Sequence, residues 1–234
     1  MNVKIGSYFQ DREQAALSVD EAEVVRRFHD LYYRRWSVAD TVRLSWFGYK
    51  LLKCPLDLWR YQELLVRTRP DVVIETGTCF GGSALYMAMI LDLIGRGQVI
   101  TIDIEARPGR PEHPRINYLT GSSVDPAIVA KVQETVSGGR AMVVLDSDHH
   151  AAHVYGEILA YHSFVQVGDY LIVEDTNING NPVYPDFGPG PMEAVTRFLS
   201  ENDEFVIDER CERFMMTFNP RGYLRRKEPT RAGG

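Results

Sequence analysis

The sequence predicts an α/β fold with a mostly parallel sheet, a helical cap before it and an antiparallel hairpin at its end. From residue 71 onward, short apolar runs rich in β-branched residues alternate with helical segments, a pattern typical of parallel sheets built from right-handed βαβ units. The residues before 71 are rich in charged and aromatic side chains with helical spacing. Two apolar runs near the end lie close enough along the chain to pair as a hairpin.

Length and composition fit one domain with a small appendage. The chain has 234 residues, 44% hydrophobic and 25% charged, which is enough for a sizeable core. The net charge of -6 argues against a nucleic-acid partner, which favours a basic face. Three scattered cysteines indicate neither a disulfide framework nor a zinc site. The sequence shows no signal-peptide core and no apolar run of the roughly 20 residues that cross a bilayer, so we expect a cytoplasmic protein without membrane insertion.

Three segments are expected along the chain. Residues 1–70 form an N-terminal helical cap on the substrate side, with helices at about 20–35 and 51–67. Residues 71–220 form the cofactor-binding core. Residues 221–234 form a basic tail that we expect to be solvated, and contact with a polyanion or a homodimer partner is the alternative.

The parallel part of the sheet is predicted from short apolar runs, and every well-marked run ends in a carboxylate. These strands are expected at 71–75, 98–103, 116–119, 141–146 and 170–174, with helices at 83–93 and 151–165 and the final hairpin at 205–208 and 213–218. In open α/β sheets, ligands bind beyond the carboxyl ends of the strands. The residues at these ends are therefore the candidates for a functional site.

A Gly-rich turn headed by an acid follows the first of these strands. Glu75 ends the strand, and Gly77 and Gly81 lie in the turn before Ser83. A dinucleotide site would need G-x-G-x-x-G for an anionic pyrophosphate, and its first glycine is absent here. An acid better suits a cationic ligand, so the turn predicts S-adenosyl-L-methionine, which carries an amino group and a sulfonium. The alternative is that Gly77 and Gly81 only make a tight strand-to-helix turn.

Two later strand ends complete the expected cofactor site. Asp103 ends the second strand, where an acid can accept hydrogen bonds from both ribose hydroxyls. Ser122 and Ser123 follow the third strand, where an adenine would lie. The acids and glycines together predict the cofactor more specifically than the turn alone.

Carboxylates also gather after the fourth and fifth strands. Asp146 ends one, and Glu174 and Asp175 end the other. Carboxylates that share a cleft repel one another unless they are protonated or neutralised by a cation. Oxygen ligands select a hard metal, most simply Mg²⁺, although Mn²⁺ can substitute. The alternative is that the Glu-Asp pair is a helix N-cap.

A histidine follows the first of these acids at short range. His149 lies three residues after Asp146 and can remove a proton from a hydroxyl whose pKa a metal lowers. We therefore expect Asp146 and His149 to be catalytic. His150 and His153 compete for the role of base, and Asp148 could orient whichever imidazole acts. A site for a softer metal within H-H-A-A-H is the alternative.

A long loop at 176–191, rich in proline, glycine and asparagine, leaves directly from the proposed metal site. Amides and flat aromatic rings suit a sugar, so we expect a small-molecule or oligosaccharide acceptor. Any of these side chains could instead be structural, and those before residue 50 could pack the cap against the sheet. The candidate acceptor-binding residues are Trp46, Tyr49, His150, Asn177, Tyr184 and Phe187.

These motifs resemble the cephalosporin hydroxylase-like family, whose members include methyltransferases. The resemblance covers roughly residues 41–226 and rests on W-x-G-x4-K-x-P, E-x-G-x3-G-G-S, the acid at 103, D-x-x-H and Y-L-I-V-E-D. Related macrolide and rhamnosyl sugar O-methyltransferases share the D-x-x-H and E-D elements. The resemblance implies a Rossmann-like class I methyltransferase fold. It also implies that Asp146, Glu174 and Asp175 hold Mg²⁺ and that His149 is the base.

The expected activity is metal-dependent methyl transfer from S-adenosyl-L-methionine to a sugar hydroxyl of a glycoside or oligosaccharide. The resemblance also makes a mannoside of methylmannose polysaccharide biosynthesis one candidate acceptor. An oxidoreductase or hydroxylase is an alternative, although a 2-His-1-carboxylate iron site would need histidines in place of the acids. A non-sugar acceptor and a catalytically idle cofactor-binding partner are the others.

Overall fold

The structure, a computed structural model, describes residues 16–37 and 44–228. Its strands are β1 (Ser45–Trp46), β2 (Tyr49–Lys50), β3 (Val72–Thr76), β4 (Gln98–Asp103), β5 (Ile116–Thr120), β6 (Ala141–Leu145), β7 (Tyr170–Val173), β8 (Phe205–Ile207) and β9 (Tyr223–Arg226). Its α-helices are α1 (Val19–Ser37), α2 (Pro55–Thr68), α3 (Gly82–Ile94), α4 (Pro126–Val136), α5 (Ala151–Tyr161) and α6 (Pro191–Glu201). Two 3₁₀ helices, η2 (His162–Phe164) and η3 (Glu209–Glu212), complete the described elements.

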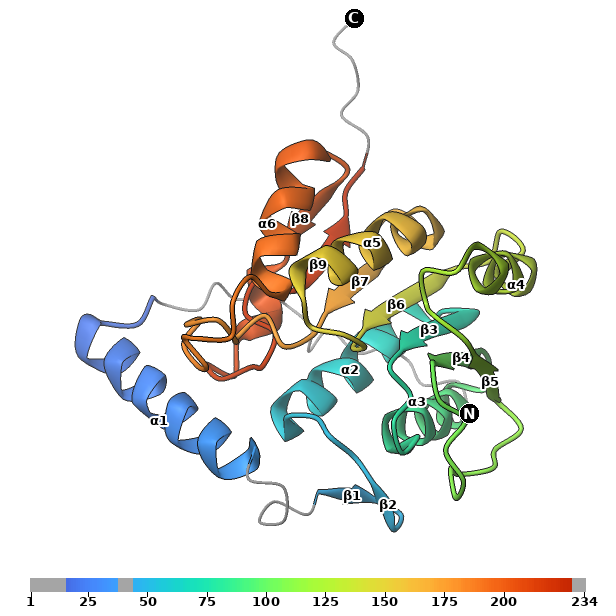
Figure 1. The fold of residues 1–234 in the computed structure, drawn as a ribbon, viewed down its shortest axis with the longest axis horizontal. Coiled ribbons are helices and arrows are strands. Elements are labelled where there is room, and N and C mark those ends of the chain that lie inside the picture. The colour runs from blue at the N-terminus through green and yellow to red at the C-terminus, as the bar shows by residue number, and fades with distance from the viewer. Residues whose placement is uncertain (1–15, 38–43, 229–234) are drawn as a thin grey trace, which may run out of the picture.

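The main sheet has the strand order β5-β4-β3-β6-β7-β9-β8 (Figure 1). Pairing from β5 through β7 is parallel, whereas β9 runs antiparallel to both β7 and β8. The chain leaves β3 toward β4 on one side and later returns to β6 on the other. This reversal puts a topological switch point between β3 and β6, where ligands of such sheets bind. The predicted mostly parallel α/β sheet with an antiparallel end is confirmed.

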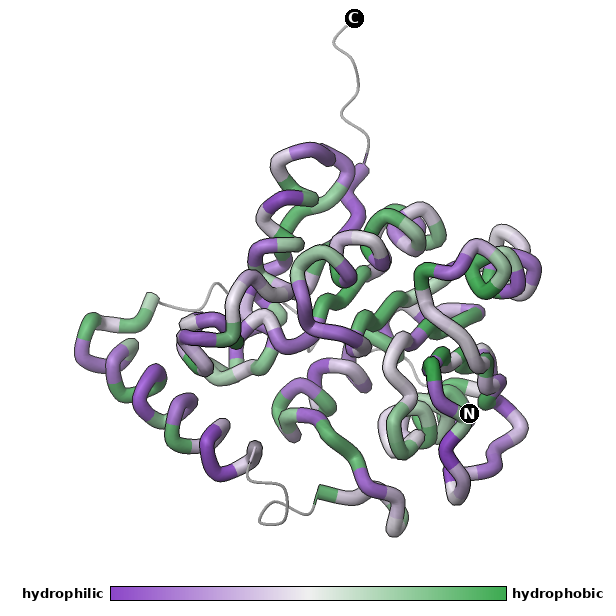
Figure 2. The backbone as a smooth tube through the Cα atoms, viewed as in Figure 1, coloured by the Kyte–Doolittle hydropathy of each residue, from purple (hydrophilic) through white to green (hydrophobic). Residues whose placement is uncertain are grey.

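Helices cover both faces of the sheet, which explains why the central strands are continuous apolar runs. Side chains of α4, α5 and α6 pack on one face, and those of α2 and α3 on the other. Every residue of β3, β6 and β7 is buried. Figure 2 shows these strands as mostly hydrophobic segments inside a more polar shell. The core therefore fixes the strand ends firmly.

The predicted second strand of the C-terminal hairpin was wrong. Residues 213–218 form no strand, and β8 pairs instead with β9. Part of the segment predicted as a solvated tail is therefore an inner strand of the sheet, and residues 229–234 lie outside the described part. The apolar residues at 213–218 have another use: Phe218 packs under α1, and its backbone N–H donates to Asp57 Oδ2 at 2.9 Å.

The cap begins with α1, which matches the predicted helix at 20–35. Ser18 and Glu21 form a capping box at its start, in which each side chain bonds the backbone N–H of the other. The second predicted helix starts later than expected, at Pro55, with Cys54 as its N-cap. Residues 51–54 precede it as an irregular segment. Within the described ranges, no helix is long and apolar enough to cross a membrane.

Candidate functional site

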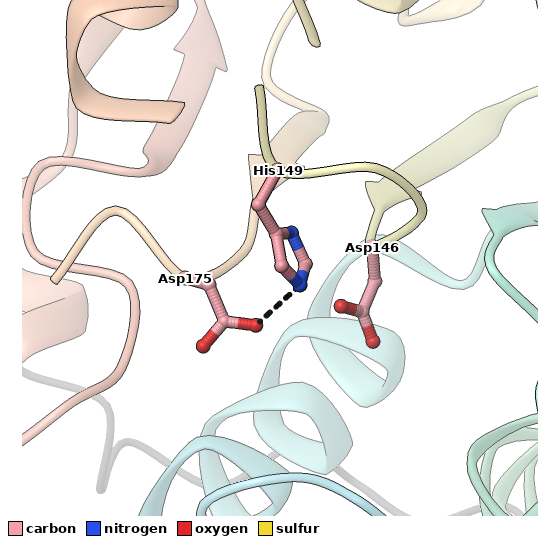
Figure 3. A group of neighbouring side chains, drawn as sticks. All are labelled: Asp146, His149 and Asp175. Atoms are coloured by element: carbon pink, nitrogen blue, oxygen red, sulfur yellow. Dashed lines mark ion pairs between the residues drawn. The ribbon is translucent and has the colours of Figure 1, made fainter. Parts of the chain in front are cut away.

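The predicted acids meet at the carboxyl ends of β6 and β7. Parallel pairing of these strands places Asp146 beside the Glu174-Asp175 pair, and the Glu174 N–H donates to Leu145 O at 3.0 Å. Asp146, His149 and Asp175 point toward one another (Figure 3). One ligand atom from each lies within 4.8 Å of the others. This spacing suits the coordination of one small cation.

Asp175 lies at a tight bend directly after β7. Its φ of 53° is in the left-handed region, which is uncommon for residues other than glycine but is adopted by aspartate and asparagine more often than by most. Its backbone N–H donates to the buried Asn219 Oδ1 at 3.1 Å, which stabilises the bend after β7. Its Oδ2 lies 3.3 Å from His149 Nε2, and its buried Oδ1 has no hydrogen-bond partner among the described residues. A buried carboxylate oxygen without a donor fits a cation ligand.

The electrostatics of the site favour a cation. Burial raises the pKa of Asp146 to about 6, with a further increase from Asp175 and opposing effects of Lys53 and His149. Burial and the charge of Asp146 raise the pKa of Glu174 to about 7, against the effect of Lys53. Burial also raises the pKa of Asp175. These acids are therefore costly to ionise together, and a bound cation would reduce that cost.

Glu174 contacts Lys53, a lysine for which no role was predicted from the sequence. Lys53 Nζ bonds both Glu174 Oε1 and, at 2.7 Å, Asp146 Oδ2. Tyr61 OH donates to the same Glu174 oxygen at 2.6 Å. Glu174 thus shares the site with the other acids but lies outside the compact Asp146–His149–Asp175 group, and its role as a metal ligand stays a prediction. The sequence signal for Lys53 was the K-x-P element before α2.

The three candidate bases have different partners. His149 faces Asp175, as described above. His150 is exposed and bonds Asp148 Oδ1 through Nδ1 at 2.6 Å, so Asp148 orients this imidazole. His153 lies 3.2 Å from Ser123 Oγ and 3.5 Å from Glu157 Oε1, on α5. The geometry favours His149 as the imidazole of the carboxylate site.

Burial lowers the pKa of His149, but the negative charges of Asp175, Asp146 and Glu174 outweigh it and raise that pKa overall. The imidazole is therefore protonated more readily while the neighbouring acids are ionised. Neutralisation of those acids would bring its pKa down, toward the range in which imidazole acts as a base.

The Gly-rich turn after β3 lies beside this group. Glu75 is fully buried, Thr101 Oγ1 donates to its Oε2 at 2.7 Å, and its Oε1 has no partner among the described residues. Burial raises the pKa of Glu75, while Lys53 and the hydroxyls of Ser83 and Thr101 oppose that increase. A cationic group that approached Oε1 would be stabilised. The predicted role of Glu75 toward an amino group is consistent with this geometry and stays a prediction.

The two glycines of the turn have structural reasons to be glycine. Gly77 has φ 85°, and a Cβ there would lie 1.7 Å from the carbonyl oxygen of Asp146. Gly81 has φ 76° and is the N-cap of α3, and a Cβ there would lie 2.8 Å from Pro111. Their tight-turn reading therefore has direct support. Contact with a cofactor stays a prediction for both, and for Ser83, which is buried in the first turn of α3.

Asp103 already accepts several hydrogen bonds. Arg110 Nη2 donates to its Oδ2 at 2.9 Å, as does the Cys79 N–H at 2.8 Å, and the Glu105 N–H donates to Oδ1 at 2.9 Å. An ionised carboxylate has about four acceptor positions, so its predicted bonds to ribose would share it with Arg110. The predicted adenine-side serines, Ser122 and Ser123, lie between β5 and α4, with Ser123 buried.

The cap residues predicted to bind an acceptor lie in the β1–β2 hairpin, where Trp46 and Tyr49 are paired. Trp46 Nε1 donates to Met89 Sδ at 3.2 Å, and its ring lies edge-on to Tyr86 at 4.9 Å. Trp46 therefore packs the cap on α3, in line with the alternative that this side chain is structural. Contact of either residue with an acceptor stays a prediction.

The predicted acceptor-binding residues of the loop after β7 differ in burial. Asn177 is fully buried and donates from Nδ2 to His29 Nε2 on α1 at 3.0 Å. Tyr184 is 54% exposed, with its ring edge-on to Tyr33 of α1 at 5.6 Å. Phe187 packs beside the exposed His150 at 5.4 Å. Tyr184, Phe187 and His150 are thus the accessible candidates, whereas Asn177 holds the loop to α1.

Comparison with known proteins places the chain among relatives of one family. The family model described as Rhamnosyl O-methyltransferase/CmcI matches residues 39–227. Proteins named rhamnosyl O-methyltransferase from Mycobacterium bovis and Mycobacterium tuberculosis are 39% identical over 202 residues, which is 82% of this chain and 82% of theirs. The protein of that name from Mycobacterium leprae is 36% identical over 211 residues, covering 87% of this chain and 91% of its own.

Solved structures share the fold at lower identity. An apo structure of CmcI superposes with a TM-score of 0.62 at 22% identity, covering 94% of this chain and 88% of that one. MycE from the mycinamycin biosynthetic pathway, in complex with Mg, SAH and mycinamycin VI, gives 0.56 at 17% identity, covering 88% and 56%. The fold is therefore that of class I methyltransferases, as predicted. Because the family model matches most of this chain, the chain belongs to the rhamnosyl O-methyltransferase/CmcI family.

Proposed function

We propose that this protein is a divalent-cation-dependent O-methyltransferase that transfers a methyl group from S-adenosyl-L-methionine to a sugar hydroxyl. The observation that carries the proposal is the Asp146–His149–Asp175 group at the ends of β6 and β7. It combines two hard oxygen ligands with an imidazole next to the switch point of the sheet. The relatives that are 36–39% identical are named rhamnosyl O-methyltransferases, and the alignment covers most of their length.

Asp146 and Asp175 would hold the cation, since the unpaired Oδ1 of Asp175 and the raised pKa values of both acids match a site that needs positive charge. Glu174 would join them if its Oε1 were released from Lys53 and Tyr61. Oxygen ligands favour Mg²⁺, with Mn²⁺ as a substitute. The CmcI structure with Mg and SAM and the MycE structure with Mg and SAH are consistent with this choice.

His149 would accept the hydroxyl proton at Nε2. When bound, the cation would lower the pKa of the acceptor hydroxyl, and S-adenosyl-L-methionine would supply the methyl group. Asp175 faces the same nitrogen at 3.3 Å and stabilises the imidazolium that forms. Exposure of 32% leaves the His149 side chain accessible to an acceptor from the solvent side. With these roles, the proton acceptor lies next to the proposed cation site and faces the side from which the acceptor hydroxyl would enter.

The acceptor would lie on the side of α1 and the loop after β7. Exposed Tyr184 and His150 and partly buried Phe187 offer flat rings and a polar edge, which suit the apolar face and hydroxyls of a sugar. The names of the relatives make a rhamnosyl glycoside the first acceptor to test. A mannoside of methylmannose polysaccharide biosynthesis is the second. A homodimer and a cytoplasmic location remain predictions.

The hydroxylase alternative has a different ligand set. A 2-His-1-carboxylate iron site needs two imidazoles, whereas the compact group in the described part of the chain has one imidazole and two carboxylates. His150 and His153 are held by Asp148 and by Ser123 with Glu157. The donor set therefore favours a hard divalent cation.

Calorimetric titration tests the proposal directly. S-adenosyl-L-methionine and S-adenosylhomocysteine are titrated into metal-stripped protein with and without Mg²⁺, and methyl transfer to rhamnosides and mannosides is then measured. We expect cofactor binding, Mg²⁺-dependent turnover, and loss of turnover with retained cofactor binding in Asp146→Asn. Absence of cofactor binding in both conditions would overturn the proposal.

A further inference from the structure

A lysine is buried at the centre of the carboxylate site. The side chain of Lys53 is 1% exposed, and its Nζ bonds Asp146 Oδ2 at 2.7 Å and Glu174 Oε1. The ammonium thus lies between two carboxylates with almost no access to solvent, and it is a positive charge that the chain itself supplies to the site.

The backbone around Lys53 is fixed on both sides. The Leu51 N–H donates to Leu44 O at 3.0 Å, and the turn that begins α2 is closed by the Asp57 N–H to Cys54 O at 3.0 Å. The carbonyl oxygen of Lys50 lies 2.3 Å from where a Cβ on Gly82 would be, so this segment presses directly on the start of α3. Lys53 is consequently held at the site by packing as well as by its charge.

The charges around Lys53 do not balance. Four buried or nearly buried carboxylates, those of Glu75, Asp146, Glu174 and Asp175, surround a single ammonium. When all four are ionised and His149 is neutral, three negative charges remain uncompensated, and two remain when the imidazole of His149 is protonated. A divalent cation would reduce the excess to one or to none. Lys53 therefore provides a smaller part of the positive charge than a divalent cation would.

We propose that Lys53 is a positioning residue that acts as the built-in counter-charge of the site and sets how tightly the divalent cation binds. It holds Asp146 and Glu174 together in the cation-free protein, and its ammonium competes electrostatically with the incoming cation. This inference rests on the proposed cation site. The direction of the change in cation affinity distinguishes this role from a merely structural one. Removal of a scaffold weakens cation binding, whereas removal of a competing charge tightens it.

The test compares Lys53→Met, which keeps most of the stem without the charge, with Arg60→Met. Arg60 is a similarly buried cation that lies away from the carboxylate site. Its guanidinium pairs with the Glu63 carboxylate at 2.8 Å. Binding of Mg²⁺ is measured by calorimetry and of Mn²⁺ by electron paramagnetic resonance. We expect about tenfold or more tightening in Lys53→Met and no change in Arg60→Met. Unchanged or weaker binding in Lys53→Met would overturn the inference.

Thermal unfolding gives a second readout that does not require turnover. Lys53→Met should melt below wild type in cation-free buffer and recover most of the difference with saturating Mg²⁺, whereas Arg60→Met should melt lower under both conditions. If Lys53→Met does not fold without a cation, the double variant Lys53→Met/Glu174→Gln removes one charge of each sign. It should fold without a cation, and its failure to do so would overturn the counter-charge role. Absence of cation binding by wild type would overturn the proposed function instead.

Discussion

Replacement of Phe218 by alanine should detach α1 while leaving the central sheet folded. Phe218 is 3% exposed and lies between α1 and the core. Its ring contacts four aromatic residues of α1 at centroid distances of 5.1–6.1 Å, namely His29, Tyr32, Tyr33 and Trp36. The hydrogen bonds of Phe218 to Asp57 and Asn177 use its backbone, so the substitution spares them.

Truncation of a buried phenylalanine costs about 3–5 kcal/mol, and the aromatic pairs are part of that loss. Because the four aromatic contacts of the Phe218 ring all belong to α1, we assign most of the loss to the docking of that helix. A loss of about 4 kcal/mol corresponds to roughly a thousandfold increase in the population of the open state. Amides of residues 22–37 should then exchange up to about a thousandfold faster, whereas those of β3 and β6 should change little.

Hydrogen exchange measured by mass spectrometry resolves these segments. The matched control is Phe214→Ala, since Phe214 lies in the same segment but packs against Arg60 and Arg213 instead of α1. Unaltered exchange in α1, or an equal increase throughout the sheet, would refute the idea that Phe218 is the main anchor of the helix.

Three further outcomes follow from the geometry. His149→Ala should lower methyl transfer by about 10²–10⁴-fold with cofactor affinity preserved, and His150→Ala should be far milder; equal effects in steady-state kinetics would contradict the assigned base. Gly77→Ala should cost about 2–4 kcal/mol in chemical denaturation because its Cβ overlaps Asp146 O, whereas Gly95→Ala, with similar φ and open space among the described residues, should cost about 1 kcal/mol. Burial lowers the pKa of His29 to about 4, so the unfolded state binds the extra proton and stability should fall by up to about 3 kcal/mol as pH drops from about 6.5 to 4. His29→Phe should flatten that part of the stability curve, and an unchanged slope would count against it.

The parallel strands could be predicted because burial on both faces makes them short apolar runs that stand out in the sequence. The C-terminal hairpin could not be placed correctly, since 213–218 has the composition of a strand but packs its apolar residues under α1. The true strand, β9, contains two arginines and resembles a solvated tail. Its Tyr223 and Leu224 are fully buried in the sheet.

The site was predictable to the level of its strand-end acids, because topology alone brings such ends together. The partner of each side chain was not. Asp148 bonds His150 instead of His149, and Asn177 turns inward to His29 on a helix nearly 150 residues away. Lys53 was equally hidden, since a lysine before a helix gives no sign that its ammonium lies between two acids.

The position of β9 makes the attachment of β8 to the sheet depend on a later segment of the chain. In the chain β8 comes first, but in the sheet β9 lies between β7 and β8. Until β9 inserts, β7 has an open edge on that side and β8 has no neighbour in the sheet with which to pair. The last strand of the described chain thus connects the edge strand β8 to the rest of the sheet, and β8 must wait for a segment that is made after it. Loss of this short strand would cost the sheet two strands.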